Sequence, residues 1–227
     1  MVDTKIITVT NQKGGCGKST ITMQLAGALG RDGEKVMVVD ADRQGTATRW
    51  SKTAPEDNPF PAAICGLSDA GGRIDLEIKK YIGIFKYIII DCPAAYDSDI
   101  PASALTVSDL ALVPVIPAPA DLWSTPDIVK LIKKTQIRNP DLIAYIVPDQ
   151  VTHTKNSGYA TGLLKKLGMN ITKSTIGMRV VYRDSQLIGG TVFDFKGGKK
   201  VTEKVRKAQD EITALKNEII KILKSNT

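Results

Sequence analysis

The residues best suited to chemistry lie between a predicted buried strand at 6–10 and a predicted helix whose apolar face spans 21–29. The segment between them reads Lys-Gly-Gly-Cys-Gly-Lys-Ser-Thr over residues 13–20. Glycines let the backbone approach an oxyanion closely, and successive N–H groups at a helix start supply positive potential. The spacing therefore predicts a phosphate-binding loop, in which Lys18 contacts the β- and γ-phosphates of a nucleotide and the Ser19 hydroxyl binds Mg²⁺.

The loop departs from the ordinary pattern G-x-x-x-x-G-K-[ST], because Gln12 stands where the first glycine is expected and a second lysine, Lys13, lies inside the loop. The form K-G-G-x-G-K-[ST] is the deviant Walker A motif, and through it the chain resembles the ParA/MinD superfamily of nucleotide-sandwich ATPases. The resemblance implies that Lys13 crosses a homodimer interface to the nucleotide of the other subunit. We interpret Cys16 as a small filler residue of the loop, and not as a nucleophile. The predicted nucleotide-binding residues of the loop are Lys13, Gly14, Gly15, Cys16, Gly17, Lys18, Ser19 and Thr20.

A second predicted strand at 36–39 runs into the acidic segment Asp-Ala-Asp-Arg-Gln-Gly over residues 40–45. Carboxylates at the C-terminal end of a parallel strand lie in the crevice where open α/β sheets bind ligands. The segment resembles the D-x-D-P-Q-G switch of the family, which implies that Asp42 orients or activates the attacking water and that Asp40 supports the Mg²⁺ shell. From the residues alone, Asp40 could equally be a turn or helix-capping aspartate. Arg43 replaces the proline usual in the family, so the rigidity of this turn does not follow from the resemblance.

A third apolar strand is predicted at 87–91 and ends in Asp91, followed by Cys92 and Pro93. An apolar strand that ends in aspartate downstream of a phosphate loop is the Walker B arrangement. Mg²⁺ gives up its water reluctantly, so Asp91 is expected to hold the ion through water. Pro93 and the residues after it match the second switch of the family.

Strands and helices alternate along the whole chain, which predicts an α/β fold with a doubly wound, mainly parallel sheet flanked by helices. This is the deviant P-loop NTPase fold that the resemblance also implies. No linker or repeat divides the chain, so we expect a single ParA-like ATPase domain over 1–227. The further predicted elements are a helix at 46–52, a strand at 62–67, a helical face at Ile74, Ile78 and Ile82, strands at 110–117 and 142–147, a helix at 159–167, and a strand and turn at 176–183.

The last part of the chain carries an apolar stripe at alternating steps of four and three residues, which predicts one long helix. We interpret the stripe as a packing face on the sheet or on a neighbouring helix. A coiled-coil dimer is the alternative, but barely three heptads are available. The stripe consists of Val201, Val205, Ala208, Ile212, Leu215, Ile219 and Ile222.

The formal charge of +7 is unevenly distributed. Residues 1–150 carry 16 Lys and Arg against 18 Asp and Glu, whereas residues 151–227 carry 15 against 6. This asymmetry predicts an anionic partner for the C-terminal third. Basic residues placed before the final turns favour DNA over lipid, and the predicted DNA contacts are Arg179, Arg183, Lys196, Lys199, Lys200 and Lys204.

Hydropathy and cysteine content exclude several classes of protein. No apolar run is long enough for a transmembrane helix, and the N-terminus has no signal-peptide pattern, which favours a cytoplasmic protein. Three widely spaced cysteines make no zinc pattern and fit a reducing compartment. An iron–sulfur reductase of the same superfamily would need two cysteine ligands per chain, and no cysteine follows Cys92.

The resemblance is strongest to a small ParA-type partition ATPase. It implies an enzyme that hydrolyses ATP with Mg²⁺, weakly until a ParB-like or other adaptor stimulates it. It also implies an ATP-dependent homodimer that binds double-stranded DNA non-specifically over the nucleoid and positions a plasmid, a chromosome or a protein cargo. Pro148 lies near the loop where the family reads adenine. The alternative is a MinD-like ATPase that binds membrane through its C-terminal amphipathic helix, for which residues 218–224 have suitable apolar and basic spacing.

Overall fold

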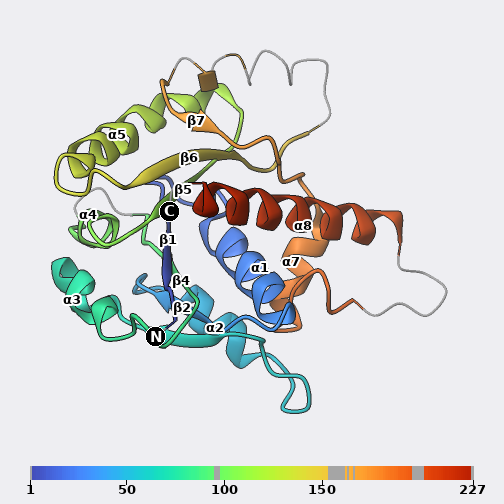
Figure 1. The fold of residues 1–227 in the computed structure, drawn as a ribbon. Coiled ribbons are helices and arrows are strands. Elements are labelled where there is room, and N and C mark those ends of the chain that lie inside the picture. The colour runs from blue at the N-terminus through green and yellow to red at the C-terminus, as the bar shows by residue number, and fades with distance from the viewer. Residues whose placement is uncertain are drawn as a thin grey trace.

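Seven strands form one sheet in which every neighbouring pair is parallel (Figure 1). The computed structural model describes residues 2–94, 98–152, 162, 164–165, 167–195 and 202–225, with the backbone alone for 119–124. The strand order is β3-β2-β4-β1-β5-β6-β7, so β1 lies at the centre and β4 is inserted between β1 and β2. The strands are β1 Lys5–Val9, β2 Val36–Asp40, β3 Ala63–Gly66, β4 Tyr87–Asp91, β5 Leu110–Val115, β6 Ile143–Pro148 and β7 Asn170–Ile171.

Helical crossovers connect the parallel strands, as such connections require. The predicted doubly wound α/β fold is confirmed, and so are the short helix at 46–52 and the strands at the three nucleotide-binding motifs. The helical segments are α1 Lys18–Arg31, α2 Thr46–Lys52, the 3₁₀-helix η1 Ser68–Arg73, α3 Ile74–Lys79, α4 Ile100–Leu105, α5 Pro119–Gln136, α7 Val180–Leu187 and α8 Glu203–Lys224. Among the described residues, no helix combines the length and apolar content needed to cross a bilayer.

Helices cover both faces of the sheet because the central strands are apolar on both sides. Successive side chains of a strand point to opposite faces, and β4 shows this plainly. Its Tyr87 and Ile89 pack in the core cluster that contains α1, α2, α7 and α8. Its Ile88 and Ile90 pack in the cluster on the other face, which contains α3 and α4.

The C-terminal helix α8 lies against α1 on one face of the sheet (Figure 1). Its apolar stripe is buried there, which confirms the interpretation of the stripe as a packing face. Val201 lies outside the described residues. The buried members are Ala208, Ile212, Leu215, Ile219 and Ile222, together with Leu223.

Two sequence predictions need correction. The segment 176–183 is not a strand, because it makes only one isolated bridge, Val151 with Gly177, and then enters α7 at Val180. β-Branched residues favoured a strand there, but Tyr182 and Val181 bury their side chains against α8 and its core cluster from a helix.

The third residue of the predicted face 74–82, Ile82, lies beyond α3 and is 49% exposed. Most of the predicted helix at 159–167 lies outside the described residues.

We expect the replacement Leu215→Ala to lower the free energy of unfolding by about 2–5 kcal/mol, because Leu215 is fully buried between α8 and α1. Leu76→Ala, which truncates an exposed leucine of α3, is the matched control and should change stability by less than about 0.5 kcal/mol. Urea unfolding followed by circular dichroism measures both. Equal effects of the two variants would show that α8 is not anchored through this stripe.

Candidate nucleotide site

The loop of residues 10–17 connects β1 to α1 and places its backbone at the C-terminal edge of the sheet. Gly15 and Gly17 have φ angles of 72° and 88°, which side-chain-bearing residues rarely adopt. Asn11 supports the loop from below: its Nδ2 donates to the Pro114 carbonyl at 2.7 Å, and its Oδ1 accepts the Lys13 N–H at 3.2 Å. The glycines and the helix start thus form the turn that a phosphate-binding loop needs.

Lys18 is 93% buried at the first position of α1, and its Nζ donates to the Lys13 carbonyl at 2.8 Å. Its ammonium group is therefore held over the loop. Cys16 is also buried, and its Sγ donates to the same carbonyl at 3.2 Å. Burial raises the pKa of the Cys16 thiol, which keeps it protonated and supports the interpretation of this residue as a filler.

A hollow of about 390 Å³ opens above this loop. Gly14, Lys18 and Ser19 line it from the loop side, and Asp42 and Gln44 line it from the segment after β2. The structure therefore brings the predicted water-orienting aspartate to the predicted phosphate loop, although the two lie far apart in the sequence. The Asp42 Oδ1 accepts the Gln44 N–H at 2.9 Å, which fixes the direction of its carboxylate.

Asp91 ends β4 beside Asp40 at the end of β2, in direct register. It is 1% exposed, and neither of its carboxylate oxygens has a hydrogen bond of ordinary geometry to a described residue. Burial raises the pKa of Asp91 to about 7, although the Ser19 hydroxyl and the Lys18 ammonium favour the charged form. A buried carboxylate without a partner is unfavourable unless a cation completes it, and Mg²⁺ prefers oxygen ligands. The residues present therefore fit a magnesium ion.

Asp40 has a different environment from Asp91. Its Oδ2 accepts the Thr48 N–H at 2.7 Å, and its Oδ1 accepts the Asp42 N–H at 3.3 Å. Both oxygens thus hold the turn between β2 and α2, in the manner of the turn or capping aspartate that the sequence also allowed. Its predicted support of the Mg²⁺ shell stays a prediction.

Two residues that the sequence analysis missed, Asp149 and Gln150, follow β6 and lie against the phosphate loop. Asp149 is 3% exposed, and its carboxylate lies so close to Gly17 that any side chain at position 17 would collide with it. Burial raises the pKa of Asp149 to about 7. Gln150 has a left-handed backbone and its Nε2 donates to the Gly15 carbonyl at 2.9 Å. Pro148 ends β6 beside them, and its predicted adenine contact stays a prediction.

The predicted DNA contacts have different environments in the structure. Arg179 is held by Glu211 of α8, with its Nε 3.0 Å from Oε2, and Tyr182 donates to the same oxygen at 2.7 Å. Glu211 thus offsets the charge of Arg179 within the fold, and the predicted DNA contact of Arg179 stays a prediction. Arg183 and Lys204 are exposed on α7 and α8. Lys196, Lys199 and Lys200 lie outside the described residues.

Comparison with known proteins extends these observations. Residues 7–226 match the model of the CobQ/CobB/MinD/ParA nucleotide binding domain family. The chain is 30% identical over 219 residues to the Maintenance of carboxysome distribution protein A of Halothiobacillus neapolitanus, an alignment that covers 94% of this chain and 95% of that protein.

Solved structures share the fold. A Cyanothece McdA–ATP complex has a TM-score of 0.78 at 16% identity, covering 96% of this chain and 97% of the McdA chain. The cell division ATPase MinD of Pyrococcus furiosus has a TM-score of 0.75 at 22% identity, covering 96% and 99%. The match of the family model over residues 7–226, almost the whole sequence, shows that this chain belongs to the CobQ/CobB/MinD/ParA family of nucleotide-binding domains.

Proposed function

We propose that this chain is a ParA-type ATPase that dimerises around ATP, binds DNA non-specifically and positions a cargo through hydrolysis that a partner protein stimulates. The observation that carries the proposal is the meeting of the two-lysine loop, Asp42 and the unpartnered Asp91 at one edge of the sheet. Proteins of the ParA/MinD family are ATPases, and ATP or ADP with magnesium is bound in solved relatives.

ATP binding begins with the phosphate loop. Lys18 donates to the Lys13 carbonyl, a neutral acceptor. The oxygens of a β- or γ-phosphate are charged acceptors and form stronger hydrogen bonds with an ammonium group. We therefore expect Lys18 to turn from the carbonyl to the phosphates, while the backbone N–H groups of Gly14, Gly15 and Gly17 bind the remaining oxygens.

Ser19 and Asp91 would hold Mg²⁺, which when bound neutralises charge on the phosphates. Asp91 is the stronger candidate ligand of the two. Its oxygens are buried at the end of β4 and form no hydrogen bond of ordinary geometry with a described residue, so they are available to a cation. Asp40 supports the arrangement from outside by holding the turn that carries Asp42.

Asp42 is the proposed water-orienting group. Its carboxylate lines the hollow, and the Gln44 N–H fixes its direction through Oδ1. A carboxylate so placed accepts a hydrogen bond from the attacking water and aligns it with the γ-phosphate. Lys13 is proposed to act across the dimer, on the nucleotide of the other subunit, which makes hydrolysis depend on dimerisation.

The DNA-binding surface is proposed to comprise Arg183 and Lys204 together with the lysines of 196–200. Lys204 is a residue of α8, but its side chain lies near the start of α7. There it lines a cavity together with Met178 and Asp184. Non-specific affinity depends steeply on how many phosphates are neutralised together, so a dimer that doubles the surface binds DNA far better than one subunit. A cytoplasmic protein associated with the nucleoid follows from this proposal.

A protein assembly is the proposed cargo. The support is the relative of Halothiobacillus neapolitanus, which is named for the maintenance of carboxysome distribution and aligns with nearly the whole chain. A plasmid or chromosome remains an alternative cargo for the same mechanism. The adaptor that links cargo and ATPase is proposed to be a separate protein that stimulates hydrolysis.

The MinD-like alternative requires a free apolar face on the C-terminal helix. The apolar residues of 218–224 include Ile219, Ile222 and Leu223, and all three are buried in the core cluster of α1. Lipid insertion of this segment would require α8 to leave the fold. DNA therefore remains the proposed anionic partner.

We expect Lys18→Ala to weaken ATP binding by roughly 10- to 100-fold, because a charge-assisted contact with the phosphates contributes about 1.5–3 kcal/mol. Titration with a fluorescent ATP analogue in the presence of Mg²⁺ measures the loss. Lys130→Ala, which removes an exposed lysine of α5, is the control and should bind normally. An unchanged affinity in a folded Lys18→Ala protein would contradict the proposed site.

Asp42→Ala should bind ATP and dimerise but lose hydrolysis, because only the water-orienting carboxylate is removed. Lys13→Ala should bind ATP and remain monomeric. Light scattering with ATP gives the mass of each variant, and phosphate release gives the rate. An Asp42→Ala protein that stays monomeric with ATP would contradict the assigned role.

DNA binding should require ATP, and Arg183→Ala or Lys204→Ala should weaken it about equally for unrelated sequences. Each lost phosphate contact should reduce the slope of log affinity against log salt by about 0.9. Lys130→Ala, on the opposite face of the sheet, should leave the slope unchanged. Equal DNA affinity of Asp42→Ala with ATP and with ADP would mean that the dimer does not gate this surface.

A further inference from the structure

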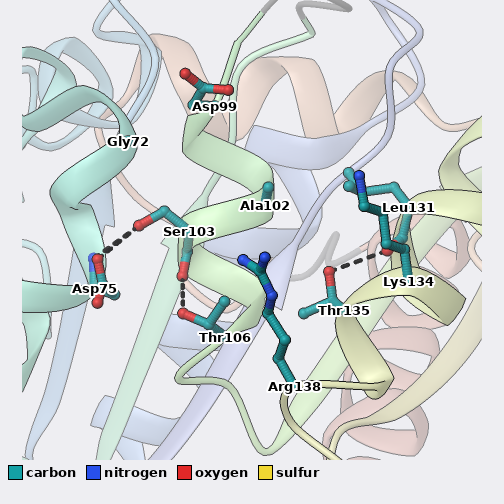
Figure 2. A pocket seen from close by; sticks show the side chains of 10 residues that line it. All are labelled: Gly72, Asp75, Asp99, Ala102, Ser103, Thr106, Leu131, Lys134, Thr135 and Arg138. Atoms are coloured by element: carbon teal, nitrogen blue, oxygen red, sulfur yellow. Dashed lines mark hydrogen bonds between the residues drawn. The ribbon is translucent and has the colours of Figure 1, made fainter.

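A cavity of about 380 Å³ lies away from the nucleotide hollow, on the face of the sheet that α3, α4 and α5 cover. Figure 2 shows it between the turn at Gly72, helix α4 and the C-terminal end of α5. Helices α1, α7 and α8 lie on the opposite face. A ligand in this cavity therefore leaves the proposed DNA-binding surface free.

The cavity has an acidic wall and a basic wall. Asp75 and Asp99 form the acidic side, and Lys134 and Arg138 form the basic side, where Arg138 extends between α4 and α5 (Figure 2). Asp75 is already engaged: its Oδ1 accepts the Ser103 hydroxyl at 2.8 Å. The charged groups of Asp99, Lys134 and Arg138 form no hydrogen bond or ion pair with any residue that the structure describes.

These charges determine which ligand fits. A polyanion such as DNA is repelled by Asp99, since Asp75 is paired with Lys79, and a purely basic peptide is repelled by Lys134 and Arg138. A ligand with a negative group facing Arg138 and a positive group facing Asp99 satisfies both walls. The acidic and basic walls are therefore complementary to a ligand that carries both a negative and a positive group.

The cavity is open at its basic wall, because Lys134 and Arg138 are exposed. Pockets for small metabolites usually bury most of their ligand, whereas an open trough lets a polypeptide segment pass through. A segment of another protein is therefore the occupant that the geometry favours over a free metabolite.

The cavity lies next to a second one that the segment carrying Asp42 lines. It shares Gly72 and Asp99 with this second cavity of about 400 Å³, which Asp42, Arg43 and Pro93 also line. Asp99 directly precedes α4, and Ser103 of α4 bonds to Asp75 of α3. A ligand bound at Asp99 therefore lies next to Asp42 and Arg43, which follow β2, and next to Pro93, which follows β4.

We propose that this cavity is the docking site for a segment of a partner protein that presents a carboxylate to Lys134 and Arg138 and a neighbouring basic side chain to Asp99. The inference rests on the proposed function for the existence of a protein partner. It adds the place on this chain and the charge pattern of the segment, and it separates the partner's site from the DNA-binding surface.

The probe is a display library of random short peptides, selected on the wild-type protein with ATP and counter-selected on the double variant Lys134→Ala/Arg138→Ala. The selected peptides should carry an acidic and a basic residue close together, and should bind the double variant at least about tenfold more weakly. Asp99→Asn should weaken the same peptides through their basic residue. Lys130→Ala, on the same helix but outside the cavity, should bind them as the wild type does.

Failure to enrich any peptide against the double variant would overturn the proposal, as would selected peptides of a single charge sign or peptides indifferent to Asp99→Asn. ATP affinity and thermal unfolding of each variant show whether the fold and the nucleotide site are intact. Absence of ATP binding by the wild-type protein would contradict the proposed function instead, and the two failures are thereby distinguished.

Discussion

Asp91 is the constraint on which the nucleotide site depends, because the fold buries this carboxylate at the centre of the sheet edge and gives its oxygens no hydrogen bond of ordinary geometry to a described residue. Burial raises the pKa of Asp91 to about 7, which shows that the fold disfavours the charged form of this carboxyl. A divalent cation removes this conflict. Binding of metal and nucleotide thus compensates the buried carboxylate of Asp91, and it stabilises the folded protein.

The residues around Asp91 hold the parts of the site in place. Asp40, its neighbour in register, uses both oxygens to hold the turn that carries Asp42. On the other side, Asp149 and Gln150 contact Gly17 and Gly15 of the loop. Asp149 and Gln150 are tied in turn to the C-terminal helix, because Val151 pairs with the segment at Gly177 and Glu211 of α8 accepts the Gly177 N–H at 3.1 Å. A chain of contacts therefore connects the phosphate loop to α8, the helix that carries Lys204.

Most of the fold and the centre of the site followed from the sequence, because both depend on local patterns. Apolar runs such as 87–91 make buried strands wherever they lie in the sheet, and the loop 13–20 determines its own backbone through its glycines. Asp149 and Gln150 could not be found in this way, since their role depends on the order of the strands, which brings the end of β6 to the loop. The ion pair of Arg179 could not be found for the same reason: its charge is visible in the sequence, but its partner Glu211 is 32 residues away.

The division of the sheet into two faces explains how one chain could serve several partners at once. The terminal helix has its apolar stripe packed on α1, so its outward face is left with charged residues such as Lys204 and Arg206. The opposite face, under α3, α4 and α5, carries the cavity with both charge signs. The nucleotide hollow opens at the edge between the two faces, where the parallel strands end. Because the two surfaces are built from different helices on opposite faces of the sheet, a ligand bound to one surface does not displace a ligand bound to the other.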